Sequence, residues 1–169
     1  MKKRRVVITG LGVVSPVGND VNDSWSNIVN GVSGIALIEN INTDNQAVKI
    51  GGAIKNLDIS QYLSPKEAKK MDIFIHYGMA AGIQAFEDSG IEVTESNAER
   101  IGVAIGAGIG GLTTIEKTAD LFREKGPRRI SPFFVPSSII NMVSGNLSIK
   151  YGLKGPNFAI VTACTTGTN

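Results

Sequence analysis

The chain has 169 residues, of which 42% are hydrophobic and 19% are charged, and its formal net charge is +2. This balance is typical of a folded α/β domain with one core and excludes a disordered or fibrous chain. The small net charge gives no support for a nucleic-acid partner, and no apolar run approaches the length that spans a bilayer.

The first predicted elements are a strand, a helix and a second short strand. The β-branched run over Arg5–Val14 predicts a buried strand entering a Gly-rich turn; its glycines favour a strand over a secretion signal. The stretch "DVNDSWSNIVNG" predicts a helix capped by Asp20 and ended by Gly31. A short strand is expected over 48–54.

A strong helix start follows in the sequence "SPKE". Ser64 is expected to cap the helix, Pro65 takes its first position and Glu67 completes a capping box. The following segment, 71–90, is apolar nearly all round, which predicts a helix buried between layers.

The remaining elements alternate between strands and helices. A strand entering a Gly-rich turn is predicted over 100–111, and an amphipathic helix over 112–126. After a loop over 127–136, helical spacing covers 137–152, and "NFAIVTA", 157–163, predicts a further buried strand. This order indicates a layered α/β fold with a mainly parallel sheet.

The glycines of "GAGIGG" raise one alternative function. Gly106, Gly108 and Gly111 match the dinucleotide fingerprint G-x-G-x-x-G between a strand and a helix. No acidic residue stands about 20 positions later to hold a ribose hydroxyl. Close packing is the simpler interpretation of these glycines, but a nucleotide-binding dehydrogenase stays open at this point.

The only cysteine, Cys164, follows the last predicted strand. A lone cysteine is unsuited to a disulfide scaffold and indicates a reducing cytoplasm. If Cys164 opens a helix, the positive end of the helix dipole would favour a nucleophilic sulfur, and nearby amides could hold an oxyanion during acyl transfer. His76, the only histidine, lies in an apolar helix and is more simply a hydrogen-bonded helix residue than a catalytic base.

The segment "ISPFFVPSSIINMVSGNLSIKYGLKGPNFAIVTACTTG" resembles the approach to the active-site cysteine of β-ketoacyl-acyl carrier protein synthases, the condensing enzymes of fatty acid elongation. "RRVVITGLGVVSPVGNDV", "KKMDIFIHYGMAA" and "GVAIGAGIGGL" extend the resemblance over the whole chain. It implies a thiolase-like αβαβα layered sandwich of which residues 1–169 form the N-terminal half only. The C-terminal half, with two catalytic histidines and a lysine, is then absent, and we expect this fragment alone to be inactive.

The resemblance also implies roles for individual residues. Cys164 matches the nucleophile that takes an acyl group from the phosphopantetheine of acyl carrier protein, so no separate cofactor and no metal are expected. Ile109 matches the residue that gates the acyl pocket, and Phe134 matches an aromatic that reaches into the partner subunit of a homodimer. Asn169 stands where the family usually has histidine, and His76 where it has glutamine.

Basic residues independently indicate an acidic partner such as acyl carrier protein. Lys66, Lys69 and Lys70 are spaced to share one helical face, and Arg128 and Arg129 lie in the predicted loop. A solvated lysine face is the alternative interpretation. A second alternative function is a non-catalytic chain-length partner of a polyketide synthase, but such proteins lack the cysteine. Chain-length preference is not set by the sequence.

Overall fold

The computed structural model describes residues 4–168, and these divide into two compact units. The first unit contains residues 4–58 and 80–91, and the second contains 59–79 and 92–168. The two units have separate sets of internal contacts, formed by different parts of the chain. No helix within residues 4–168 combines the length and apolar character needed to cross a bilayer.

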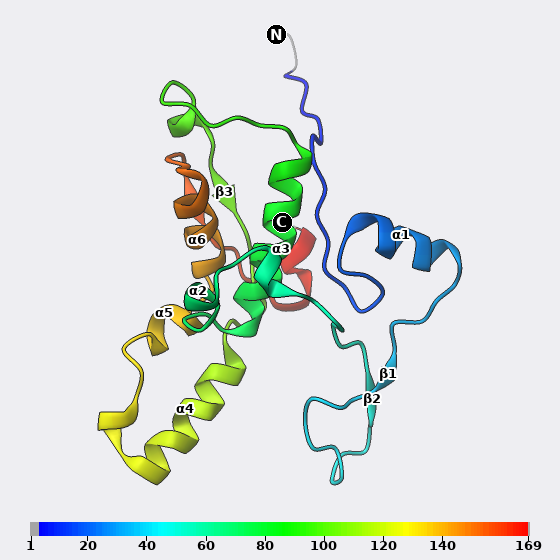
Figure 1. Ribbon diagram of the computed structural model, residues 1–169, viewed down its shortest axis with the longest axis vertical. Helices are drawn as coiled ribbons and strands as arrows, with labels where there is room; N and C mark the ends of the chain where they lie inside the picture. The colour runs from blue at the N-terminus through cyan, green and yellow to red at the C-terminus, as the bar shows by residue number, and fades with distance from the viewer. Residues whose placement is uncertain (1–3, 169) are drawn as a thin grey trace. The chain divides into compact units, whose positions relative to one another are not determined.

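The first unit contains one complete helix, one small antiparallel sheet and, in residues 80–88, the C-terminal part of a longer helix (Figure 1). Helix α1 (Val21–Val29) begins where the Asp20 carboxylate accepts the Asp23 N–H at 2.8 Å, and Gly31, with φ +68°, follows its end. Strand β1 (Ala36–Leu37) pairs antiparallel with β2 (Ile50–Gly51). Both the predicted helix and the predicted second strand are confirmed.

The predicted strand over Arg5–Val14 is wrong, because this segment is extended but joins no ladder. It runs along the end of helix α3 (Ile73–Asp88), where the Leu11 N–H donates to Asp88 at 2.8 Å. Val6 is 92% exposed. A β-branched run forms a strand only where a neighbouring strand pairs with it, and in this unit side chains take the backbone donors instead.

The second unit begins with the predicted capping box. The Glu67 N–H donates to the Ser64 hydroxyl at 3.3 Å, and the Ser64 N–H donates to the Glu67 carboxylate at 2.9 Å. Helix α2 (Pro65–Ala68) is nevertheless only four residues long. It ends before Asp72, whose side chain caps the start of α3. The predicted helical region is thus two helices.

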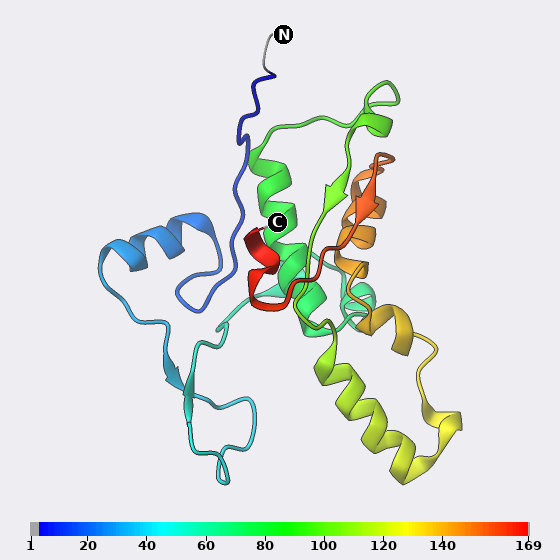
Figure 2. The ribbon, with the colours of Figure 1, turned by 180° about the vertical axis from the view of Figure 1, so that it is seen from behind.

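A parallel pair of strands forms the centre of the second unit. Strand β3 (Val103–Ala104) pairs with β4 (Asn157–Phe158), and α6 (Met142–Tyr151) lies alongside them (Figures 1 and 2). The α/β class and the parallel pairing are confirmed, but the predicted strand over 157–163 pairs only at its first two residues. The unit's core consists of apolar side chains that are at most 9% exposed: Leu63, Ile75, Met79, Ala98, Val103, Val143, Leu147 and Leu153.

Two further helices complete the second unit. Helix α4 (Leu112–Lys125) ends at Gly126 as predicted. Helix α5 (Phe134–Ser138) begins inside the segment predicted as a loop. Four short 3₁₀ helices, Ile59–Gln61, Ala98–Arg100, Pro127–Arg129 and Ala163–Thr168, connect the described elements.

Candidate active site

The Gly-rich loop and the cysteine segment leave the same edge of the β3–β4 pair. The Val103 N–H donates to the Pro156 carbonyl at 2.8 Å, and the Ile105 N–H donates to the Phe158 carbonyl at 3.4 Å. Because the two strands are parallel, their carboxyl ends meet at one edge of the ladder. All the site residues predicted above lie in the second unit. Asn169 lies outside the described residues.

Cys164 is exposed in a tight turn that threonine side chains hold together. The Thr166 hydroxyl accepts the Thr162 N–H at 3.0 Å and donates to the Ala163 carbonyl at 2.7 Å. Ala163 has φ +50°, a left-handed conformation that costs a non-glycine residue about 1–3 kcal/mol. The hydrogen bonds of the turn thus hold Ala163, the residue before the cysteine, in an unfavourable backbone conformation.

The expectation that Cys164 opens an α-helix is wrong for the described residues. The segment Ala163–Thr168 is a 3₁₀ helix of six residues. Such a short segment has too few aligned peptide units for the macrodipole argument to apply. The described structure therefore presents the sulfur to solvent without the predicted helix terminus.

The glycines of the loop allow it to approach the cysteine segment closely. A Cβ atom on Gly106 would overlap the Thr166 methyl group and the Ile160 carbonyl oxygen. A Cβ atom on Gly108 would lie at an ordinary 3.7 Å from the Ala163 carbonyl oxygen. Close packing is therefore the role that the structure gives to Gly106, as the simpler sequence interpretation proposed.

The same loop leads into α4, and the start of this helix is already occupied. Gly111 is its N-cap residue, and the Thr114 N–H in its first turn donates to the Asp72 carboxylate at 2.8 Å. A dinucleotide needs this position for its pyrophosphate, which the carboxylate would repel. The dehydrogenase alternative loses its structural basis here.

Ile109 projects beside an open hollow of about 440 Å³. The loop 105–110 forms one wall, and Phe74, Tyr77, Gly78 and Val143 also line the hollow. Partial burial raises the pKa of the Tyr77 hydroxyl, so this group stays neutral. Ile109 is 70% exposed, and the surroundings suit an apolar chain. Cys164 does not line the hollow, but Gly106 lines it and also packs against Thr166 in the cysteine turn.

Phe134 begins α5 and is half-buried. Its carbonyl oxygen accepts hydrogen bonds from the hydroxyl groups of Ser137 and Ser138, each at 2.9 Å. The preceding residue, Phe133, is exposed, and the Lys70 ammonium lies 4.7 Å from the centre of its ring. The predicted role of Phe134 in a partner subunit is a property of an assembly and stays a prediction.

The predicted basic residues form two sets on different elements of the second unit. Lys66 and Lys69 are exposed on the short turn of α2, while Lys70 is half-buried. Arg128 and Arg129 are exposed in the 3₁₀ helix after α4. In both views of the ribbon this yellow segment lies apart from α2 (Figures 1 and 2).

Sequence reasoning missed Lys150, which adds a positive charge near α2. Its ammonium donates to the Tyr62 carbonyl at 3.3 Å. Hydrogen bonds from the Ser64 hydroxyl and amide hold the pKa of the Glu67 carboxyl below its ordinary value, and the charges of Lys150 and Lys70 act in the same direction. No spacing rule links Lys150 to α2, because the two are more than 80 residues apart in the chain.

His76 is confirmed as a hydrogen-bonded helix residue. Its Nε2 lies 2.9 Å from the Ala68 carbonyl oxygen, which can only accept, so this nitrogen carries the proton. Among residues 4–168, no three His, Cys, Asp or Glu side chains gather as a metal site.

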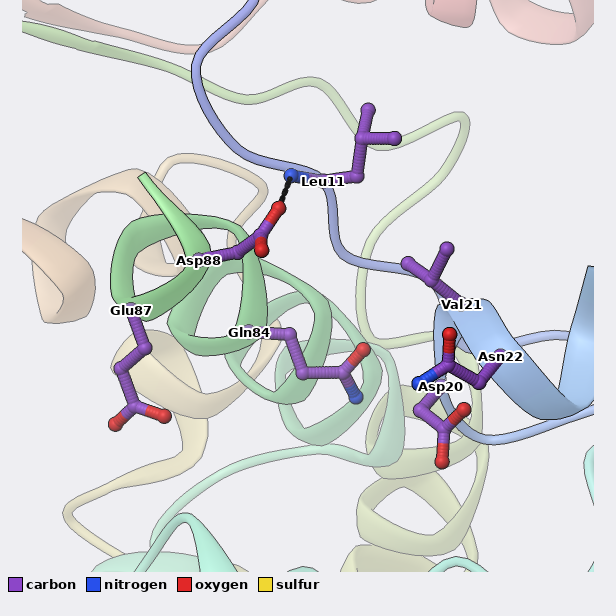
Figure 3. Close-up of a pocket in the computed structure, with 7 residues that line it drawn as sticks. All are labelled: Leu11, Asp20, Val21, Asn22, Gln84, Glu87 and Asp88. Carbon is purple, nitrogen blue, oxygen red and sulfur yellow. Dashed lines mark hydrogen bonds between the residues drawn. The ribbon is translucent and has the colours of Figure 1, made fainter. Parts of the chain in front are cut away.

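The first unit contains a separate acidic hollow of about 370 Å³. Figure 3 shows the Asp88 carboxylate turned toward the Leu11 amide, which donates to it at 2.8 Å, whereas Glu87 points away from Leu11. The Gln84 amide oxygen accepts the Val13 N–H at 3.2 Å. Asp88 and Gln84 therefore bind the extended segment to α3. This structural role explains why these polar side chains line the hollow.

Known proteins are similar to this chain in both sequence and fold. Residues 3–169 match the family model described as the N-terminal domain of beta-ketoacyl synthase. The chain is 61% identical over 167 residues to 3-oxoacyl-[acyl-carrier-protein] synthase 2 of Vibrio cholerae and 53% identical to the Coxiella burnetii protein of that name. Each match covers 99% of this chain but 40% of the relative, so the chain spans less than half the length of these curated relatives.

A solved structure of a beta-ketoacyl synthase from Burkholderia phymatum aligns with a TM-score of 0.77 and 21% identity, covering 98% of this chain and 41% of that one. A type II polyketide ketosynthase in complex with its acyl carrier protein aligns with a TM-score of 0.70 and 24% identity, covering 92% and 41%. These likenesses confirm the thiolase-like ketosynthase fold, of which the chain forms the N-terminal portion.

Proposed function

Because the chain belongs to the β-ketoacyl synthase family, we propose that the full-length protein is a condensing enzyme of fatty acid elongation. It joins a cysteine-bound acyl group to the two-carbon unit of malonyl-acyl carrier protein and releases 3-oxoacyl-acyl carrier protein and CO₂. The observation that carries the proposal is the meeting of the Cys164 turn and the Gly106 loop at the carboxyl edge of β3 and β4.

The proposed reaction has two stages. The Cys164 sulfur attacks the thioester carbonyl carbon, a new C–S bond forms, and the phosphopantetheine thiol leaves with the proton. The malonyl group then loses CO₂, and its carbanion equivalent attacks the acyl-cysteine carbonyl. The new C–C bond forms as the C–S bond breaks, which returns the Cys164 sulfur.

Residues 1–169 supply only part of the machinery for this reaction. The nucleophile, the Gly-rich loop and the Ile109 side of the acyl pocket lie within the chain. The family resemblance assigns decarboxylation to two histidines, which complete the site together with a lysine, and none of these residues has a counterpart here. The activity is therefore proposed for the full-length protein, and the 169-residue chain alone is proposed to be inactive.

The proposed partner is acyl carrier protein, which brings the phosphopantetheine, so the enzyme needs no cofactor of its own. Its acidic surface suits the exposed charges of Lys66 and Lys69, with Arg128 and Arg129 as a second set of contacts. The related ketosynthase solved with its carrier protein supports this class of partner. A cytoplasmic homodimer, with Phe134 at the subunit interface, completes the proposal.

An acylation experiment tests the nucleophile directly. Full-length protein is incubated with an acyl thioester, digested and analysed by mass spectrometry, and we expect one acyl group on the peptide that contains Cys164. A Cys164→Ser variant, matched in size, serves as the control. An adduct that persists in this variant would overturn the assignment.

The non-catalytic chain-length partner remains the alternative function. The cysteine separates the two, because a partner without a nucleophile forms no acyl-enzyme. Condensation of an acyl primer with malonyl-acyl carrier protein by full-length protein would exclude the alternative, and acylation without condensation would favour a different acyl transfer.

A further inference from the structure

Asp72 is a buried carboxylate that serves two helices at once. Asp72 lies between α2 and α3 and is only 5% exposed. One oxygen accepts the Phe74 N–H of α3 at 3.1 Å, and the other accepts the Thr114 N–H of α4 at 2.8 Å. Both N–H groups belong to first helical turns, which have no intrahelical partner for their donors.

The backbone around Asp72 continues this connection into α5. The Asp72 N–H donates to the Ser137 carbonyl at 3.3 Å, and the Gly111 N–H donates to the Ser138 carbonyl at 2.9 Å. These hydrogen bonds therefore form a closed ring. Asp72 bonds to Thr114 in the first turn of α4, Gly111 at the start of α4 bonds to α5, and α5 bonds back to Asp72. Three segments that are far apart in the sequence are fixed by one closed set of hydrogen bonds.

The loop that carries Ile109 ends at this set of bonds. Ile109 precedes Gly110, whose φ of +91° favours glycine, and a Cβ atom on Gly111 would lie 2.7 Å from the Ser138 Cα atom. The loop thus has no freedom to shift at its α4 end while Asp72 holds Thr114. Phe74, which is bonded to the same carboxylate, also lines the hollow that the loop lines.

We propose that Asp72 is a positioning residue for the acyl pocket: it fixes the distance between the Ile109 loop and the α3 wall, and so sets the range of acyl chains accepted. The assignment of the hollow to an acyl chain rests on the proposed function, whereas the positioning of the Ile109 loop by Asp72 does not. Asp72 touches no reacting atom and acts through Ile109 and Phe74.

A carboxylate is required because two donors need two acceptor oxygens. Asparagine has the same shape but only one acceptor, and its NH₂ group would face one of the two N–H donors. Asp20 offers a matched comparison, since its carboxylate accepts the Asp23 N–H at the start of α1 in the first unit. Asparagine caps such a single helix almost as well as aspartate.

The first test uses unmodified full-length protein. Amide hydrogen exchange is followed at Thr114, whose N–H would exchange as a frayed helix end if the carboxylate did not hold it. We expect this amide to be protected at least about tenfold more than the Asp23 amide in the first turn of α1, because the latter bond is exposed. Equal, fast exchange at both positions would overturn the proposal without any substitution.

The second test compares Asp72→Asn with Asp20→Asn in full-length protein. In Asp72→Asn we expect exchange across 106–114 to quicken, and the ratio of kcat/KM for a long to that for a short acyl primer to change by about tenfold. Asp20→Asn should change neither. A purely structural role for Asp72 would lower kcat equally for all primers and leave that ratio constant, which would contradict the proposal.

The two hypotheses fail in different ways. If wild-type protein condenses no primer but Asp72→Asn still loosens 106–114, the proposed function fails and the positioning stands. If condensation is normal and the primer ratio is unchanged in a folded Asp72→Asn variant, the positioning role fails and the function stands.

Discussion

Gly106 and Thr166 lie so close together that a methyl group on Gly106 would overlap the methyl group of Thr166. Thr166 also holds the cysteine turn, because its hydroxyl bonds to Thr162 and Ala163. The position of Cys164 therefore depends on the absence of a side chain about 60 residues earlier in the chain.

Gly106→Ala is expected to slow acylation of Cys164 in full-length protein by about ten- to a hundredfold. The added methyl group displaces the turn, and a misplacement of about 1 Å is enough for a loss of this size. The rate of acyl transfer from an acyl thioester measures it. Gly108→Ala is the control, since its Cβ atom would meet only an ordinary contact of 3.7 Å. Equal losses in the two variants would contradict the packing explanation.

Ile109→Phe is expected to lower kcat/KM for long acyl primers by about tenfold while short primers react normally. The larger side chain fills part of the hollow that the loop 105–110 lines. Ile109→Val, which removes one methylene group and keeps the β-branch, is the control. Turnover that is the same for all primers in both variants would show that Ile109 does not limit the pocket.

Reversal of two exposed charges, Lys66→Glu with Lys69→Glu, is expected to slow association with acyl carrier protein by about tenfold at low salt. Added salt should shrink the difference, because exposed charges are screened. Lys70 is left unchanged, since it lies over the Phe133 ring. Stopped-flow association rates measure the effect.

Its control is the double variant Lys117→Glu with Lys154→Glu, which changes the net charge equally at exposed positions outside the two basic sets. An equal decrease in both double variants would mean that only net charge matters. A separate reversal of Arg128 and Arg129 tests the second set, because the two sets lie apart (Figure 2).

The capping box predicts a pH-dependent contribution to stability. Hydrogen bonds from Ser64 hold the pKa of Glu67 below its ordinary value of 4.5, so the folded state favours the ionised carboxylate. This contribution is complete above about pH 4.5 and is lost as the pH falls through the lower folded pKa. Glu67→Ala should therefore reduce the free energy of unfolding at pH 7 and have a smaller effect in acid.

Urea unfolding of full-length protein at pH 7 and pH 3 measures this difference. Ser64→Ala removes the cap itself and is expected to cost about 0.5–2 kcal/mol at pH 7. A Glu67→Ala effect that is the same at both pH values would show that the carboxylate charge does not contribute.

Local signals predicted the helices well, because each helix start depends on residues within one turn. Asp20 and the Ser64–Glu67 box mark starts that the structure confirms. Gly126 and Gly31 likewise follow helix ends. The early end of α2 was missed because Asp72 starts a new helix, α3, by accepting the Phe74 N–H, while its other oxygen bonds to the Thr114 amide, which is 42 residues away.

Strands were harder to predict, because a strand exists only where a partner strand pairs with it. Val6 and Ile8 have strong strand preferences but are 92% and 83% exposed without a ladder. Cys164 was found from its motif and the resemblance, whereas Lys150 and Asp72 became visible only through distant contacts. Part of the site can therefore be predicted from local sequence, and the rest depends on contacts between residues far apart in the chain.

The last prediction concerns the 169-residue chain in isolation, which is expected to self-associate. Its described sheets contain only two residue pairs each, and an isolated pair of short strands is marginal in water. Val6, Trp25 and Ile149 are 92%, 66% and 78% exposed, and large bare apolar areas drive association. Light scattering after size-exclusion chromatography should show species larger than a monomer, and ANS fluorescence should exceed that of the full-length protein. A monomer that melts cooperatively and binds little ANS would show instead that these residues fold stably by themselves, and that the exposed apolar side chains need no further cover.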